Sequence, residues 1–199
     1  MEDICKEAIL SPYKVDDIDV KIADEISRHI RHCKQICDVG FGNTLLAETL
    51  VKHNPDVNYI GIDLDPICVS DAQKKSLGKN ISFLAGQVNK INLPLIDCFV
   101  VSRVAHHMSM EEMETTLHNM MVHVMQCGKL VIVDSIRDYT NRPQHYLYLP
   151  FYFIANTYQY LSSHKIDCNF IGDAKVNKYW VLELDVLKTR AKYSLKFID

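Results

Sequence analysis

Residues 36–44 read ICDVGFGNT, an apolar run that ends in a carboxylate and two glycines. A second apolar run, YIGID at residues 59–63, also ends in a carboxylate. Glycine permits a tight turn and a close approach of the backbone to a ligand, because it has no Cβ. A carboxylate at the tip of the next strand can accept both hydroxyls of a ribose. The two stretches therefore predict a nucleoside-containing cofactor across the ends of two adjacent parallel strands.

The glycine spacing argues against a nicotinamide dinucleotide. A G-x-G-x-x-G fingerprint that starts at Gly40 requires a third glycine at position 45, where the chain has Leu45. Asp38 also stands two residues before the first glycine. A carboxylate there repels a pyrophosphate, which prefers a helix N-terminus without nearby negative charge. The same carboxylate suits a cationic ligand.

Three further landmarks follow in order along the chain. They are residues 61–65, 96–102 and 127–134, which read GIDLD, IDCFVVS and CGKLVIVD. Together with DVGFGNT at residues 38–44, they resemble the class I S-adenosylmethionine-dependent methyltransferases, whose first motif is close to D-x-G-x-G-x-G. Thr44 replaces the last glycine of that motif. The resemblance covers about residues 36–138. It implies an α/β fold with a doubly wound, mostly parallel, seven-stranded sheet, helices on both faces and an antiparallel C-terminal hairpin.

The bulk composition is typical of one globular domain, with 199 residues, 48% hydrophobic side chains and 24% charged ones. A formal net charge of -3 provides no general attraction to nucleic acid or to an anionic membrane. The first residues, MEDIC, lack the basic and then apolar order of a signal peptide, and no apolar run is long enough to span a bilayer. Seven scattered cysteines fit thiols in a reducing compartment. We therefore expect a cytoplasmic protein without membrane contact.

Strand-like and helix-like segments alternate through the first two thirds of the chain. The expected strands are residues 35–39, 57–62, 81–84, 96–101 and 130–134, and the expected helices are 15–34, 43–53, 66–77 and 110–125. This alternation predicts parallel pairing with right-handed crossovers. We expect one domain over residues 1–199, with a helical cap at 1–34, a cofactor-binding core at 35–138 and a tail at 139–199.

The tail has a different character. Residues 146–160 contain seven aromatic side chains, which can form a helix on the last strands, wall an acceptor pocket or make a dimer surface. Residues 167–171 and 179–187 read as two strands with a short polar link, so we expect them to pair antiparallel.

The methionines of the 110–125 helix are expected to fill gaps in the core.

The resemblance implies roles for residues around the two turns. Asp38 would contact the amino acid part of the donor through the glycine loop, and Asp63 would hold the ribose hydroxyls. Leu64 or Asp65 would flank the adenine. Gln87 falls where many relatives have an acidic residue that contacts the adenine amine, and its amide oxygen can accept the same bond. The full set of expected cofactor contacts is Asp38, Gly40, Gly42, Asn43, Asp63, Leu64, Gln87 and Ser102.

Two histidines are the candidate catalytic residues. Residues 102–108, SRVAHHM, follow the fourth expected strand and should emerge at the carboxyl edge of the sheet, where open α/β sheets bind ligands. His106 and His107 are the histidines expected near the transferred methyl, and either can act as general base or have a structural role. This segment has no carboxylate cluster of the kind that holds magnesium, so no metal is expected.

The sequence thus predicts a methyltransferase that uses S-adenosylmethionine without a metal and methylates an oxygen or nitrogen. The acceptor is expected to be a small molecule. Methylation of RNA or protein is an alternative, and so is a catalytically degenerate subunit with a binding or scaffolding role. The sequence leaves the acceptor and the oligomeric state open, with a homodimer among the options.

Overall fold

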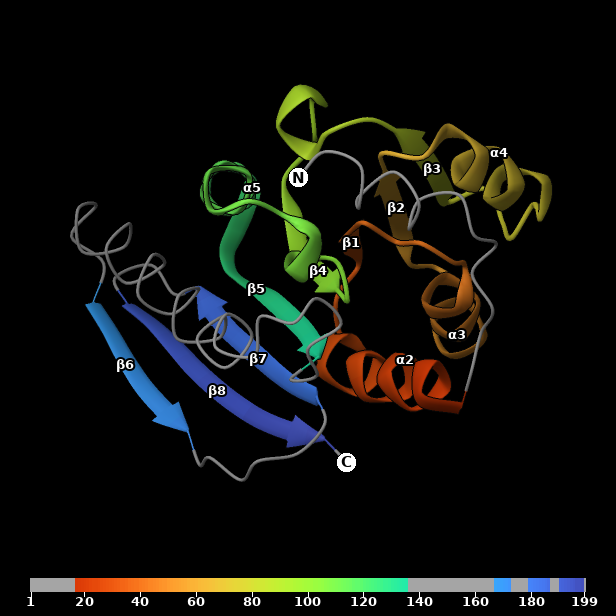
Figure 1. Cartoon of the computed structure of the whole chain (residues 1–199). Coiled ribbons are helices and arrows are strands. Elements are labelled where there is room, and N and C mark those ends of the chain that lie inside the picture. The colour runs from red at the N-terminus through yellow and green to blue at the C-terminus, as the bar shows by residue number, and fades with distance from the viewer. Residues whose placement is uncertain (1–16, 136–166, 173–178, 187–189, 199) are drawn as a thin grey trace.

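The computed structural model describes residues 17–135, 167–172, 179–186 and 190–198. These residues form an eight-stranded sheet in the order β3-β2-β1-β4-β5-β7-β8-β6, shown in Figure 1. The strands are β1 (Gln35–Val39), β2 (Asn58–Asp63), β3 (Ile81–Ala85), β4 (Ile96–Ser102), β5 (Val124–Ser135), β6 (Asp167–Gly172), β7 (Tyr179–Val186) and β8 (Arg190–Ile198). Strands β1 to β5 pair in parallel, which confirms the predicted doubly wound, mostly parallel α/β sheet.

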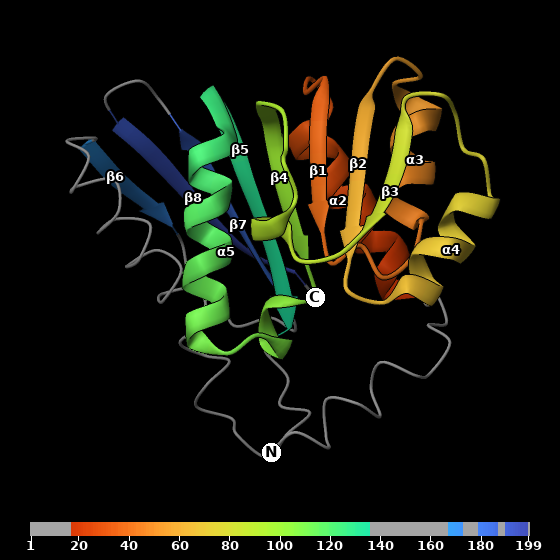
Figure 2. The ribbon, with the colours of Figure 1, turned by 90° about the horizontal axis from the view of Figure 1, so that it is seen from above.

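Helices cover both faces of the sheet, as Figure 2 shows. They are α2 (Asp17–Ile30), α3 (Leu45–His53), α4 (Pro66–Lys74) and α5 (Met110–His123), with short 3-10 turns η1 (Val88–Lys90) and η2 (Ala105–His107). Buried side chains of α2, α3 and α4 pack on one face, and those of α5 pack on the other. Among the described residues, no helix combines the length and apolarity needed to cross a membrane.

Alternation along the strands assigns each side chain to one of the two cores. Cys37 of β1 belongs to the core beneath α5, whereas Ile36 belongs to the core beneath α2 and α3. Asp38 therefore points to the same face as Ile36, because successive strand side chains alternate between faces. The helix expected at residues 15–34 is present as α2 but ends at Ile30, and its Ile22, Ile26 and Ile30 are buried in that second core.

The methionines expected in the 110–125 helix divide into two groups. Met113, Met120 and Met121 are buried, as predicted for side chains that fill the core. Met125 is 37% exposed, so its predicted core position is wrong. The reason is that α5 ends at His123 and the chain passes directly into β5, where the helical spacing no longer applies.

The C-terminal pairing differs from the prediction. The sheet has eight strands rather than seven, and β6 does not pair with β7. Instead β7 pairs antiparallel with both β5 and β8, and β6 pairs parallel with β8. Residues 190–198, RAKYSLKFI, alternate apolar and polar side chains and make the extra strand. Their three-residue link to β7 favours a tight hairpin over a pairing between β6 and β7.

Candidate functional site

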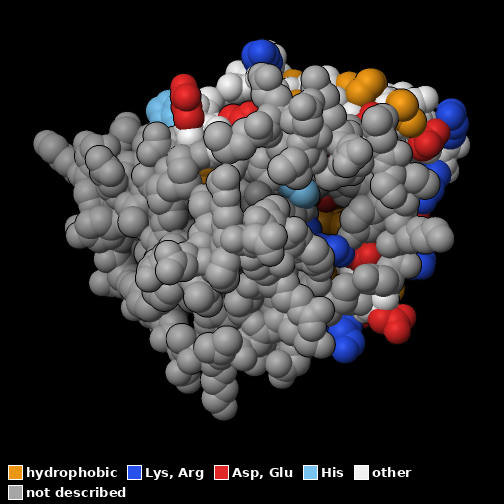
Figure 3. All heavy atoms as spheres, viewed as in Figure 1, with side chains coloured by type: hydrophobic (Ala, Val, Ile, Leu, Met, Phe, Trp, Pro, Cys, Tyr) orange, Lys and Arg blue, Asp and Glu red, His pale blue; other side chains and the backbone are white. Residues whose placement is uncertain are grey.

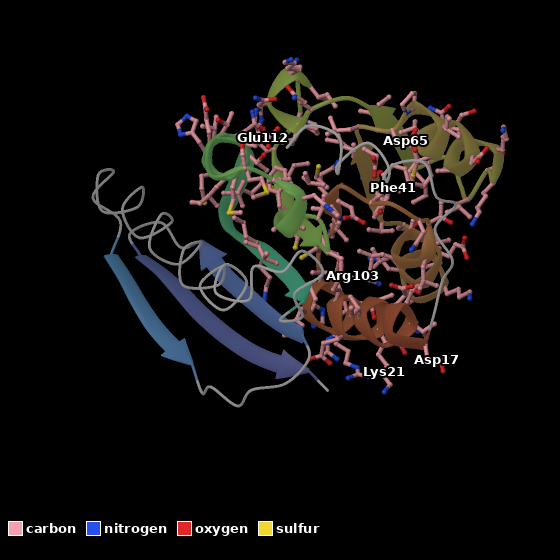
Figure 4. All side chains as sticks on the ribbon, in the orientation of Figure 1. Asp17, Lys21, Phe41, Asp65, Arg103 and Glu112 are labelled. Carbon is pink, nitrogen blue, oxygen red and sulfur yellow. The ribbon has the colours of Figure 1, made fainter. Side chains whose placement is uncertain are left out.

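Three strands end at the same side of the sheet and carry the residues singled out from the sequence. We call residues 38–44 and 63–68 the β1–β2 edge, and residues 102–108 the β4 edge. Parallel pairing places Asp38 opposite Gly61 and Val100, so these ends lie next to one another. In Figure 4, Phe41 and Asp65 mark the two turns of the β1–β2 edge and Arg103 marks the β4 edge.

Two glycines shape the turn after β1 for different reasons. Both have positive φ, +73° at Gly40 and +56° at Gly42, a region that glycine adopts without strain. A Cβ on Gly40 would lie 2.6 Å from Val104 Cγ2, whereas a Cβ on Gly42 would meet nothing within 4 Å. Gly40 therefore lets the β4 edge pack against the turn, and Gly42 leaves open space beside it.

Asp38 is buried and has one satisfied oxygen. Its exposed fraction is 2%, and the Tyr59 hydroxyl donates a 2.6 Å hydrogen bond to Asp38 Oδ2. Burial raises the pKa of Asp38 to about 7, the Tyr59 hydrogen bond opposes the rise, and the nearby Asp63 charge adds to it. The other oxygen, Oδ1, is buried and has no hydrogen-bond donor in the part of the chain that the structure describes. A hydrogen-bond acceptor in that position suits a positively charged ligand.

Tyr59 reaches Asp38 because of the strand register. Gly61 lies opposite Asp38, and Tyr59 stands two residues earlier on the same face of β2. The ring packs edge-on to Phe83, with centroids 5.9 Å apart, and Phe83 in turn contacts Phe41 at 4.9 Å. A Cβ on Gly61 would lie 2.7 Å from Phe83, so a side chain larger than glycine would displace this aromatic cluster.

Asp63 ties the two turns of the β1–β2 edge together. Its Oδ2 accepts the Gly42 N–H at 2.9 Å, and its Oδ1 accepts the Asp65 N–H at 3.0 Å. Asp65 begins α4 by accepting the Ile67 N–H at 2.8 Å. The adjacent Leu64 is 64% exposed and Ile67 is 63% exposed, so two apolar side chains lie open beside the carboxylate.

Cys68 supports the same turn from the first part of α4. Its thiol donates to the Gly42 carbonyl oxygen at 2.8 Å. Burial, together with the charges of Asp63, Asp65 and Asp71, raises the pKa of Cys68 to about 12. The thiol therefore stays protonated and acts as a hydrogen-bond donor, which no motif in the sequence indicated.

Asn43 and Thr44 serve the start of α3. Asn43 Oδ1 accepts the Leu45 N–H at 2.9 Å. Thr44 is buried, and its hydroxyl contacts Glu48 at 2.6 Å and Lys75 at 2.5 Å. Lys75 also binds Glu48 at 2.9 Å and lowers the pKa of that carboxyl. The residue that replaces the third glycine of the motif thus joins α3 to the end of α4.

Gln87 lies at the end of β3, next to the β1–β2 edge. It is exposed and precedes η1. The preceding Gly86 donates its N–H to the Asp63 carbonyl oxygen at 2.8 Å, which brings the ends of β2 and β3 together. The role of Gln87 toward the adenine amine stays a prediction.

The β4 edge is fixed by backbone geometry and a long-range ion pair. Arg103 follows Ser102 with φ +58°, and its N–H donates to the Val133 carbonyl oxygen at 2.8 Å. Its guanidinium pairs with Asp19 of α2, which is buried, and Figure 4 shows Arg103 between the end of β4 and α2. The sequence reasoning missed Asp19, because 84 residues separate the two partners.

The two candidate histidines belong to η2, directly after Val104. His107 is exposed, and its N–H donates to the Val104 carbonyl oxygen at 3.0 Å. The side chain of His106 lies outside the described part of the structure. Ser109 and Glu112 then start α5 with reciprocal hydrogen bonds of 3.2 and 2.7 Å, which fixes the direction in which the chain leaves this edge.

Two further features of the sequence concern a metal site and the aromatic stretch. Within residues 17–135 and the described strands, no three His, Cys, Asp or Glu side chains gather where they could hold a metal ion. The aromatic stretch at residues 146–160 lies outside the described residues.

Solved structures define the class of fold. The N-methyltransferase NodS of Bradyrhizobium japonicum gives a TM-score of 0.66 at 18% identity and covers 87% of this chain and 100% of that chain. NodS has also been solved in complex with S-adenosyl-L-homocysteine. The mitomycin 7-O-methyltransferase MmcR gives a TM-score of 0.62 at 11% identity, over 85% of this chain and 54% of that chain. At these identities the likeness establishes the fold, which is that of the class I methyltransferases.

The sequence comparison defines the family. Residues 17–158 match the O-methyltransferase domain, which is more than half of the chain. The chain therefore belongs to the O-methyltransferase domain family, and the predicted resemblance is confirmed. O-methyltransferase 12 of Dictyostelium discoideum is 28% identical over 114 residues, which is 54% of this chain and 30% of that protein. The chain thus spans just under a third of the length of this curated relative.

Proposed function

We propose that the chain binds S-adenosylmethionine across the β1–β2 edge and transfers its methyl group to an oxygen of a small molecule. The observation that carries this proposal is the pair of carboxylates that flank the glycine turn. Asp38 keeps a buried oxygen to which no described residue donates a hydrogen bond, and Asp63 holds the turn beside open, apolar side chains. Asp38 suits the ammonium of the donor's amino acid part, and Asp63 suits the ribose hydroxyls.

The remaining residues of this edge fit the donor. Gly42 is exposed and leaves open space on its Cβ side, so a ligand can approach the backbone there. The exposed Leu64 offers apolar surface for a flat base. Gln87 follows Gly86, whose N–H binds the Asp63 carbonyl oxygen, and its amide can bind the adenine amine. We propose that Ser102, at the end of β4, lies beside the bound donor, on the side where the acceptor binds.

S-adenosylmethionine supplies a methyl on a sulfonium, which is already an activated leaving group. The chain must therefore orient the acceptor hydroxyl, exclude water and remove one proton. We assign proton removal to His106 or His107, since both belong to η2 within the β4 edge. The fixed backbone of Arg103 and the packing of Val104 on Gly40 would hold the two histidines at a constant distance from the donor.

An oxygen acceptor is favoured over a nitrogen by the family match, which is to an O-methyltransferase domain. A small-molecule acceptor is favoured by the relatives and by the surface. Figure 3 shows Lys and Arg side chains interspersed with Asp and Glu on the described surface over α3 and α4. Such a mixed surface gives this face no strong field to attract RNA. We also propose a cytoplasmic location, because Cys37 and Cys68 are free thiols.

A transfer assay tests the function. The purified chain is incubated with S-adenosylmethionine and a panel of phenols, alcohols and amines, and formation of S-adenosylhomocysteine is measured. We expect turnover with hydroxyl acceptors and loss of turnover in His106→Ala or His107→Ala, with donor binding retained. Binding of the donor without turnover of any acceptor class would favour the degenerate, scaffolding alternative.

A further inference from the structure

Tyr59 and Asp38 form a buried polar pair that the proposed donor site does not by itself explain. Tyr59 has no exposed surface and Asp38 has 2%, and both lie among the apolar side chains beneath α2 and α3. A buried hydrogen bond between neutral groups contributes only about 1 kcal/mol, while an unsatisfied buried acceptor costs about 1–3 kcal/mol. The pair alone therefore does not favour folding, which indicates that Asp38 Oδ1 is kept for another partner.

In the described part of the chain, the titratable groups that face this pair do not supply that partner. The titratable side chains that act on Asp38 and Tyr59 are Cys37 on β1, Asp63 on β2 and Cys68 on α4. None of these three is a cation. In the absence of a ligand, burial and the Asp63 charge therefore favour the protonated form of Asp38.

We propose that Tyr59 is a positioning residue of the donor site, which holds one oxygen of Asp38, leaves the other for the cationic amino acid part of the donor, and couples donor binding to release of a proton from Asp38. This inference rests on the proposed function, since it requires that the donor bind over the glycine turn. The carboxyl proton leaves for solvent, and the ligand ammonium keeps its own protons. Direct contact is not required, because an opposite charge within about 4–6 Å already favours the carboxylate.

Proton release from Asp38 should be measurable, and it should make the affinity for the donor depend on pH. Because the pKa of Asp38 without ligand is about 7, binding should release most of one proton at pH 6 and only a small fraction of one at pH 8. The dissociation constant should accordingly rise about tenfold between pH 8 and pH 6. Loss of the Tyr59 hydroxyl removes a hydrogen bond that favours the carboxylate, so the midpoint of proton release should move above pH 7 and binding at pH 7 should weaken about fivefold.

Calorimetric titration with S-adenosylhomocysteine tests this without any methyl transfer. Each titration is run at pH 6, 7 and 8 in two buffers of different ionisation enthalpy, which gives the number of protons released. The proteins are wild type, Asp38→Asn and Tyr59→Phe. The asparagine cannot ionise, so the difference between wild type and Asp38→Asn removes the titration of the ligand amine and of other side chains. Tyr59→Phe keeps the ring packing on Phe83, and a thermal melt verifies its fold.

Each outcome decides the matter. Proton release that follows the trend above in wild type, vanishes in Asp38→Asn and shifts upward in pH in Tyr59→Phe supports the inference. Should Asp38→Asn bind too weakly to measure, the wild-type count and the Tyr59→Phe shift decide it. Binding without proton release, or a Tyr59→Phe variant that is only less stable with an unchanged midpoint, overturns the inference and leaves the proposed function intact. Absence of binding at every pH overturns both.

Discussion

The β1–β2 edge and the β4 edge are built in different ways. The β1–β2 edge is held by contacts of short sequence separation. The hydrogen bonds from Tyr59 to Asp38 and from Gly42 to Asp63 each span 21 residues. The β4 edge is held across 84 residues by the ion pair between Arg103 and Asp19. Local contacts form within one strand-helix-strand unit, whereas the β4 edge depends on how α2 packs on the sheet. The β1–β2 edge is thus held mainly by contacts within one strand-helix-strand unit, and the β4 edge by a contact between distant segments.

The two edges meet at Gly40, and the largest expected effect tests that junction. Gly40→Ala should lower the free energy of unfolding by about 4 kcal/mol, because it adds a strained positive φ to a clash with Val104. Gly42→Ala should cost only about 1–2 kcal/mol, since it has the same strain and no clash. Urea denaturation measures both. Equal losses in the two variants would mean that the edges do not touch at Gly40.

Removal of Arg103 tests the long-range support of the β4 edge. Arg103→Ala should destabilise the protein by about 3 kcal/mol, because it removes the charge that pairs with the buried Asp19 carboxylate. Lys74→Ala is the matched control: its partner is Asp71 in the same helix, and both side chains are exposed (71% and 64%), so the change should be below about 0.5 kcal/mol. Comparable losses in urea denaturation would contradict the assembly described for the β4 edge.

The buried carboxyl makes the β1–β2 edge sensitive to pH. Asp38 has a pKa of about 7 when folded and 3.8 as its ordinary value, so the folded state binds the proton more tightly. Its contribution to stability is therefore full below about pH 4 and is lost as the pH rises through 7. Between pH 5 and pH 8, the stability of the wild type should fall by about 2–3 kcal/mol relative to Asp38→Asn. A constant difference between the two proteins would show that Asp38 is ionised throughout.

Substitution of Thr44 has the smallest expected effect and tests whether this side chain narrows the donor site. Thr44→Gly restores the glycine of the family motif, and Thr44→Val keeps the shape without the hydroxyl. Each should cost about 1 kcal/mol through loss of the contacts with Glu48 and Lys75. Affinity for the donor should change less than about twofold. Tighter binding in Thr44→Gly alone would show that the threonine restricts the pocket.

Most of the β1–β2 edge was predictable because its signals are local. Glycines, a following carboxylate and strand periodicity all lie within 30 residues, and the predicted positions of Gly42, Asp63 and Leu64 agree with one shared edge. Tyr59 was missed because a tyrosine in an apolar run looks like any core residue until the register places it beside Asp38. Asp19 and the pairing of β8 were missed for a related reason, since both depend on contacts between distant segments.

The central claim is that Asp63 and the glycine turn bind S-adenosylmethionine. Calorimetric titration of wild type, Asp63→Ala and Asp71→Ala with this ligand tests it most directly. Asp71 is an exposed carboxylate of α4 that pairs with Lys74, so its variant matches the charge change without touching the turn. We expect binding to the wild type, a loss of about 100-fold in Asp63→Ala and no change in Asp71→Ala. No binding to the wild type, or equal binding by all three proteins, would contradict the claim.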